Sequence, residues 1–219
     1  MRYLRFAVAA LGLAASAAFA SPADPKLGTD YTQLATPQPV QAVGKKVEVI
    51  EFFMYHCPHC NVLEPFLAEW VKKRSNDIVF KRVHMPYTGA NDPEAHLYLT
   101  LEAMGKLDEM HAKVFKAIHV DRMRPTEPAL IDFVVKNGVD KAKFMDAWNS
   151  FGVMTKLKRL PSILSAYKID SVPTLVIDGR LVTSPAQVGA SSPSMDEGAL
   201  SRATIQALDN IVTKVAKSK

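Results

Sequence analysis

Residues 46–60 read Lys-Val-Glu-Val-Ile-Glu-Phe-Phe-Met-Tyr-His-Cys-Pro-His-Cys. The first eight are rich in β-branched and aromatic side chains, and the run becomes almost wholly apolar toward Phe53. This pattern predicts a strand buried on both faces, as in the centre of a parallel or mixed sheet. The two cysteines follow within seven residues, so we expect them where this strand ends and the next helix begins.

The residues after Cys60 predict that this strand belongs to a βαβ unit. A helix is expected from Cys60 to about Arg74, kinked at Pro65, and a second strand from Ile78 to Met85. The apolar residues that recur at helical spacing are Leu63, Phe66, Leu67, Trp70 and Val71. Strand, helix and strand in this order require a parallel pair joined by a right-handed crossover.

The rest of the chain divides into a helical middle and a second sheet-forming part. Helices are expected near 93–104, 107–119, 127–136, 140–150 and 152–166. The sheet resumes at Thr174 with a hairpin whose two-residue turn is Asp178-Gly179, and a last helix runs over about 200–216. Residues 21–44 predict an extended lead-in without a helix. We therefore expect an α/β fold, with a core of about 45–85 and 168–219 and an all-helical insertion of about 90–167.

The N-terminus has the features of a secretory signal peptide. Arg2 and Arg5 precede an apolar run over residues 6–20 that ends in Ala18-Phe19-Ala20. This predicts export, with cleavage after Ala20 and a mature chain of 21–219. The alternative is an uncleaved membrane anchor, although the run is shorter than the roughly 20 residues of a span.

The charge of the mature chain is mildly basic and does not favour nucleic acid as a partner. Removing residues 1–20 lowers the net charge from +5 to +3, with 25 Lys and Arg against 22 Asp and Glu. The charges are scattered, and the longest basic run is Lys72-Lys73-Arg74, as expected for a solvated helix end. We expect a monomer.

The cysteine content points to reactivity rather than to structural cross-linking. The chain has two cysteines, three positions apart, in a protein expected to enter an oxidising compartment. A bridge closing so short a loop is worth about 2 kcal/mol in the chain-entropy model, against about 3 kcal/mol for fifteen residues. The alternatives are an inert bridge, and a zinc site built from His56, Cys57, His59 and Cys60, which would lack the second cysteine pair of typical zinc sites.

The position of the cysteines at a helix start explains how such a pair could react. Thiolate is the nucleophile in disulfide exchange, and unpaired N–H groups at a helix N-terminus stabilise an anion. Cys57 is therefore expected to be the exposed, attacking sulfur and Cys60 the buried, resolving one. Pro58 suits the first helical turn, and His59 can place positive charge beside the thiolate; the alternative for His59 is a plain surface histidine. His56 could add to that charge or be a plain surface histidine.

Two further elements are candidates for the same site. Glu51 lies inside the apolar strand, and a buried carboxyl there could exchange a proton with Cys60; the alternative is an outward-facing edge position. Val172-Pro173 stands at the entrance to the hairpin, where a cis bond would leave the Val172 backbone free to pair with a bound peptide. The residues alone give cis only as the minority expectation.

Together these features resemble the DsbA family of bacterial periplasmic disulfide oxidases, which have a thioredoxin-like fold. The resemblance covers nearly all of the mature chain. It is carried by Glu51-Phe52-Phe53 before Cys-Pro-His-Cys, the helical insertion, Val172-Pro173, Tyr31-Thr32, Asn137-Gly138 and residues 147–151, Ala-Trp-Asn-Ser-Phe.

The resemblance implies roles for individual residues. Cys57 would be the nucleophile, Cys60 the resolving thiol, His59 a stabiliser of the thiolate and Glu51 the buried acid. Pro173 would be a cis-proline facing the disulfide, with Val172 contacting substrate. The substrates would be unfolded exported proteins, and a quinone-linked membrane partner of the DsbB type would reoxidise the cysteines, with no metal or organic cofactor. His56 departs from the family, whose members often carry an aromatic residue there.

Two rival functions remain open at the level of sequence. An isomerase or reductase of the same fold would use the same cysteines, although 199 mature residues leave little room for the dimerisation domain usual in such isomerases. A peptide-binding chaperone would not need the cysteines at all.

Overall fold

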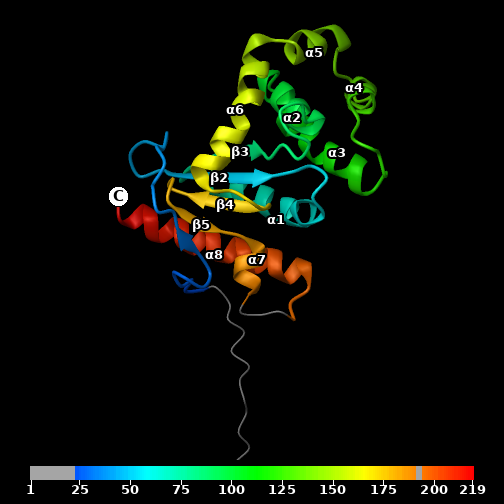
Figure 1. The fold of residues 1–219 in the computed structure, drawn as a ribbon. Coiled ribbons are helices and arrows are strands. Elements are labelled where there is room, and N and C mark those ends of the chain that lie inside the picture. Colours follow the sequence, from blue (N-terminus) through cyan, green and yellow to red (C-terminus); the bar gives the residue numbers. More distant parts are fainter. Residues whose placement is uncertain (1–22, 191–193) are drawn as a thin grey trace, which may run out of the picture.

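A five-stranded mixed sheet lies at the centre of the molecule (Figure 1). The structure is a computed structural model that describes residues 23–190 and 194–219, so the expected signal peptide of residues 1–20 lies outside the described residues. The strands are β1 (Thr32–Gln33), β2 (Val47–Phe53), β3 (Ile78–His84), β4 (Thr174–Ile177) and β5 (Leu181–Thr183), in the spatial order β1-β5-β4-β2-β3.

The decisive stretch of sequence forms the strand that holds the sheet together. β2 pairs in parallel with β3 and antiparallel with β4, and all seven of its residues are buried. The crossover between β2 and β3 is α1 (Pro58–Arg74), with Pro65 inside it. The predicted βαβ unit is therefore confirmed, and Glu51 lies on a central strand rather than at an edge.

Helices cover both faces of the sheet. On one face, β2 and β4 pack against α1 and α8 (Glu197–Lys217) in a cluster that includes Val49, Leu67 and Ile211. On the other face, Ile50, Phe52 and Val176 pack against side chains of α6 (Phe151–Tyr167). Within the described ranges, no helix combines the length and the apolarity that a membrane span requires.

The helical insertion lies between β3 and β4 and has its own apolar core. It comprises α2 (Pro93–Ala103), α3 (Leu107–His119), α4 (Glu127–Lys136), α5 (Lys141–Trp148) and α6. Its core cluster also contains Phe53, Tyr55 and both cysteines, so the end of β2 and the start of α1 lie where the insertion meets the sheet. The predicted α/β fold of thioredoxin type, with a helical insertion, is confirmed.

Three details of the lead-in and the second sheet-forming part differ from the sequence prediction. Asp178 and Gly179 do adopt left-handed φ values of 53° and 65°, but Arg180 also lies between the paired residues Ile177 and Leu181, so the connection has three residues instead of two. The short strand β1 and the five-residue helix α7 (Pro185–Gly189) were not predicted.

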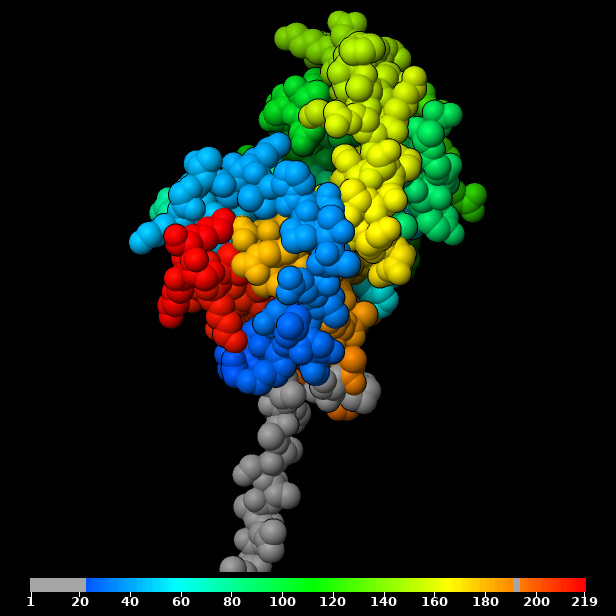
Figure 2. Space-filling view, turned by 60° about the vertical axis from the view of Figure 1, so that its left-hand side comes forward, coloured from blue at the N-terminus to red at the C-terminus, as the bar shows by residue number. Residues whose placement is uncertain are grey.

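The lead-in lies across the hairpin, between the C-terminal helix and α6 (Figure 2). β1 pairs antiparallel with β5, and the Gln38 N–H donates to the Gly179 carbonyl at 2.8 Å. A Cβ on Gly179 would come within 2.2 Å of the Gln38 carbonyl oxygen, so this close approach requires glycine as much as the turn does.

Candidate active site

Cys57 is the N-cap residue of α1. Its φ and ψ of −73° and 118° are extended, Pro58 occupies the first helical turn, and the Cys57 Sγ accepts the Cys60 N–H at 3.4 Å. A side chain that accepts a free N–H is what an N-cap normally supplies, usually through oxygen. Here sulfur takes that place, so the helix start itself offers its unpaired donors to the Cys57 side chain.

The solvent exposure of the two cysteines differs less than the sequence predicted. Cys57 is only 6% exposed and Cys60 is fully buried, and both thiols are free. The prediction that Cys57 is an exposed sulfur is therefore wrong, because the Val172–Pro173 segment packs over it, with the Val172 carbonyl oxygen 3.6 Å from the Cys57 sulfur. The Val172–Pro173 bond is cis, Val172 is half-buried and Pro173 is buried.

The surroundings separate the two thiols chemically. A hydrogen bond from the Cys60 thiol lowers the pKa of Cys57 from 9.0 to about 6, against the effect of burial; the main-chain N–H groups of Cys60 and His59 and the charge of His59 also lower it. Burial raises the pKa of Cys60 far above its ordinary value, and the charges of Cys57 and Glu51 raise it further. Near neutral pH the reduced pair therefore holds one thiolate, on Cys57, and one thiol, on Cys60.

Glu51 is a buried acid beside this pair. Burial raises its pKa from 4.5 to about 7, although Arg82 works in the opposite direction. The Arg82 Nε donates to Glu51 Oε2 at 2.7 Å, and the Arg82 Nη2 donates to both carboxylate oxygens of Glu64 at 2.9 Å. The second oxygen of Glu51, Oε1, is buried and has no hydrogen-bond partner.

The network continues into the insertion. His111 Nε2 of α3 lies 3.4 Å from Glu64 Oε2, and His111 Nδ1 is 2.9 Å from the Tyr55 hydroxyl. Arg82, Glu64 and His111 were not predicted as site residues from the sequence. A charged residue within the second predicted strand is the signal that could have indicated Arg82, since its partner on the neighbouring strand is Glu51.

The two histidines of the motif region each contact a carboxylate. His59 is exposed, and its Nδ1 lies 2.8 Å from Glu197 Oε1 at the start of α8. His56 is half-buried, and its Nδ1 lies 2.9 Å from both oxygens of Glu94 at the start of α2. Neither carboxylate was predicted from the sequence, because both are far from the cysteines along the chain.

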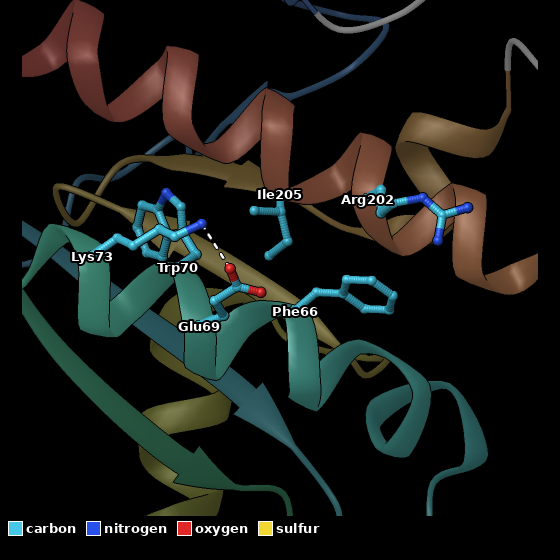
Figure 3. A pocket seen from close by; sticks show the side chains of 6 residues that line it. All are labelled: Phe66, Glu69, Trp70, Lys73, Arg202 and Ile205. Atoms are coloured by element: carbon cyan, nitrogen blue, oxygen red, sulfur yellow. Dashed lines mark ion pairs between the residues drawn. The ribbon is translucent and has the colours of Figure 1, made fainter.

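A hollow of about 160 Å³ lies between α1 and α8, where Arg202 approaches the Phe66 ring and Glu69 pairs with Lys73 (Figure 3). Its α1 residues start two turns beyond Cys57, so we do not assign it to the same site. Over residues 23–190 and 194–219, no group of three or more His, Cys, Asp or Glu side chains is arranged to hold a metal ion.

This arrangement can support thiol–disulfide exchange without a further group. One sulfur is stabilised as an anion at a helix N-terminus, the other is buried beside an acid whose pKa is near neutral, and a main-chain carbonyl lies next to the reactive sulfur. These are the requirements for a good leaving thiolate, a proton exchanger and a peptide contact.

Comparison with known proteins gives one consistent result. Residues 87–201 match the model of the DSBA-like thioredoxin domain family. The thiol:disulfide interchange protein DsbA of Burkholderia cepacia is 42% identical over 210 residues, which cover 95% of this chain and 94% of that protein. The corresponding protein of Bordetella parapertussis is 37% identical over 83% of this chain and 87% of its own. The crystal structure of Pseudomonas aeruginosa DsbA superposes with a TM-score of 0.76 and 32% identity, covering 90% of this chain and 98% of that one.

Proposed function

The chain belongs to the DsbA family of thiol:disulfide oxidoreductases, and on that premise we propose that its Cys57–Cys60 disulfide is the group it donates as a periplasmic disulfide oxidase. The observation that carries this assignment is the position of Cys57 as N-cap of α1, with its pKa lowered to about 6. One pKa unit below pH 7 stabilises the reduced form by about 1.4 kcal/mol, and this makes the disulfide about 30 mV more oxidising.

The reaction begins with a substrate thiolate. It attacks the Cys57 sulfur of the oxidised protein, a substrate–Cys57 bond forms and the Cys57–Cys60 bond breaks, so that Cys60 leaves as a thiolate. A second substrate thiolate then attacks the substrate sulfur of this mixed disulfide. The substrate disulfide forms, Cys57 leaves as a thiolate, and the protein has gained two electrons.

Glu51 handles the proton of Cys60. Because the pKa of Cys60 is raised well above its ordinary value, its thiolate takes up a proton as soon as it is released. Glu51 has a pKa of about 7 and an unpaired buried oxygen, so it can hold that proton beforehand and return it. Arg82 prevents the pKa of Glu51 from rising further and keeps the acid in place.

The Val172–Pro173 segment binds the substrate chain. The Val172 carbonyl oxygen lies 3.6 Å from the Cys57 sulfur, so a peptide that approaches the sulfur passes this main chain and can pair with it as a short strand. His59 adds positive charge beside the thiolate, and Pro58 sets the first turn of α1.

Export and reoxidation complete the proposal. The basic residues Arg2 and Arg5, the apolar run and Ala18-Phe19-Ala20 support cleavage after Ala20 and transfer to the periplasm. The substrates are newly exported, unfolded proteins, and a quinone-linked membrane protein of the DsbB type takes the two electrons from the reduced pair. We expect the protein to act as a monomer.

Equilibration with glutathione tests the direction of the reaction. The Cys57–Cys60 pair is expected to be reduced by glutathione buffers that leave a thioredoxin-like couple, at about −270 mV, oxidised. Oxidative refolding of a reduced, unfolded substrate should be fast, and insulin reduction slow. A potential near that of thioredoxin would instead support a reductase. The variant Cys57→Ser/Cys60→Ser should lose all oxidase activity; a chaperone would keep its activity.

A further inference from the structure

One buried carboxylate joins the helical insertion to the residue before the nucleophile. Glu94 Oε2 accepts the His56 main-chain N–H at 3.0 Å, and the His56 Nδ1 lies 2.9 Å from both Glu94 oxygens. Glu94 is 4% exposed. A single side chain of the insertion therefore fixes both the backbone and the ring of the residue next to Cys57.

The start of α2 is built to hold this carboxylate still. Asp92 caps the helix by accepting the Ala95 N–H at 2.8 Å, and it also accepts the N–H groups of Tyr87 and Thr88. Glu94 follows in the first turn, where the helix dipole favours negative charge. The Tyr87 ring also contacts the His56 ring, with 5.1 Å between the ring centroids and an interplanar angle of 66°.

The charges of the pair are complementary. Although burial raises the pKa of Glu94, the hydrogen bond from His56 and the neighbouring His84 ring lower it to about 2, so the group is ionised at all working pH values. The hydrogen bond to Glu94 in turn raises the pKa of His56. The other charged groups that face His56 are Asp92 and the Cys57 thiolate, and both also raise its pKa. His84 Nε2 approaches Glu94 Oε2 at 3.6 Å and accepts the Tyr55 N–H.

We propose that Glu94 is a positioning residue for disulfide exchange, which holds His56 in place as a cation beside Cys57 and thereby sets how strongly the protein oxidises. The inference rests on the function proposed above. Because the Cys57 thiolate favours the charged form of His56, a charged His56 favours the thiolate to the same degree. The helical insertion thus reaches the reactive sulfur through Glu94 and His56.

A double-mutant cycle with Glu94→Gln and His56→Gln tests the proposal. Each single variant is expected to raise the pKa of Cys57, followed by thiolate absorbance against pH, and to shift the glutathione equilibrium about threefold toward the disulfide, the size expected for one nearby charge in a water-like dielectric. Threefold corresponds to about 14 mV. Glu94→Gln in the His56→Gln background should have no further effect. NMR titration of the His56 ring should show its pKa falling in Glu94→Gln.

Glu102→Gln is the matched control. Glu102 lies on the same helix and pairs with Lys156 of α6 at 2.7 Å, so its variant also breaks an ion pair of the insertion, away from Cys57. It should leave the Cys57 titration unchanged. If Glu94→Gln does not fold, Glu94→Asp replaces it in the comparison, because Asp keeps the charge. His56→Gln is expected to fold in either case, because His56 is half-buried.

Two results would overturn the inference. One is a Glu94→Gln protein in which the His56 titration moves but the Cys57 titration and the glutathione equilibrium do not. The other is an equal effect of Glu94→Gln with and without His56. Failure of the proposed function can be told apart from failure of this inference. It would appear as a redox potential of the wild-type protein near that of thioredoxin, independently of the results for the variants.

Discussion

Replacing Cys60 by alanine should raise the pKa of Cys57 by about one to two units. The hydrogen bond from the Cys60 thiol is the largest of the interactions that lower this pKa to about 6. A hydrogen bond to a charged group is worth about 1.5–3 kcal/mol, and one pKa unit corresponds to 1.36 kcal/mol. In Cys60→Ala the thiolate keeps the N–H groups of residues 59 and 60 and the charge of His59, so we expect a pKa of about 7 to 8.

The assay is the absorbance of the thiolate near 240 nm as a function of pH, supported by the rate of alkylation. The chain has two cysteines, so Cys60→Ala leaves one titrating sulfur and the signal needs no assignment. Cys60→Ser is the matched control, because a hydroxyl of similar size can donate in place of the thiol. The pKa of Cys57 in this variant should stay within about half a unit of the wild-type value. A Cys60→Ala protein that still titrates near 6 would refute the reasoning and assign the whole effect to the helix N-terminus.

Three further predictions follow from the same structure. In the reduced protein the pKa of Cys57 is lowered from 9.0 to about 6. The Cys57 thiolate therefore contributes fully to the free energy of unfolding above pH 9, and this contribution is lost as the pH falls to 6. After allowance for screening, urea titrations should show a loss of about 2 kcal/mol over this range in the reduced protein and no such loss in the oxidised protein. Glu51→Gln should slow formation of the mixed disulfide at least about tenfold near pH 6 in stopped-flow measurements, where Glu51 carries its proton, with a smaller effect near pH 8.5, and an unchanged rate at both pH values would exclude Glu51 from proton transfer. Phe53→Ala, at a fully buried ring that contacts Tyr55 and His111, should cost about 3–5 kcal/mol in chemical denaturation, whereas Phe151→Ala, at an 87% exposed ring, should cost less than about 0.5 kcal/mol.

Local sequence patterns predicted the long elements of this fold closely. β2, α1 and the five helices of the insertion begin and end within about two residues of the expected positions, because each has a periodic apolar face and clear end signals. β1 and α7 were missed because two and five residues carry too little pattern to be recognised. β1 exists through its pairing with β5, some 150 residues further along the chain, and no local signal reports that pairing.

The candidate site was predicted most completely where its residues are close in sequence. The cysteine pair, Pro58 and His59 lie in one motif, and the burial of Glu51 follows from its apolar neighbours. The exposure of Cys57 was predicted wrongly because its cover comes from the Val172–Pro173 segment, 115 residues away. Glu94, Arg82 and His111 were missed for the same reason, since each reaches the site through the tertiary fold.

Strand register links the fold to the proposed chemistry. Glu51 of β2 stands opposite Arg82 of β3, in the parallel pairing that also aligns Val47 with Ile78. A slip by one residue would turn Arg82 to the other face of the sheet and leave the Glu51 carboxyl buried without a counter-charge. Its pKa would then rise further above 7, and the acid would no longer release its proton near neutral pH. The apolar pattern that fixes this register therefore also keeps the pKa of Glu51 in the range where the carboxyl can exchange a proton with Cys60.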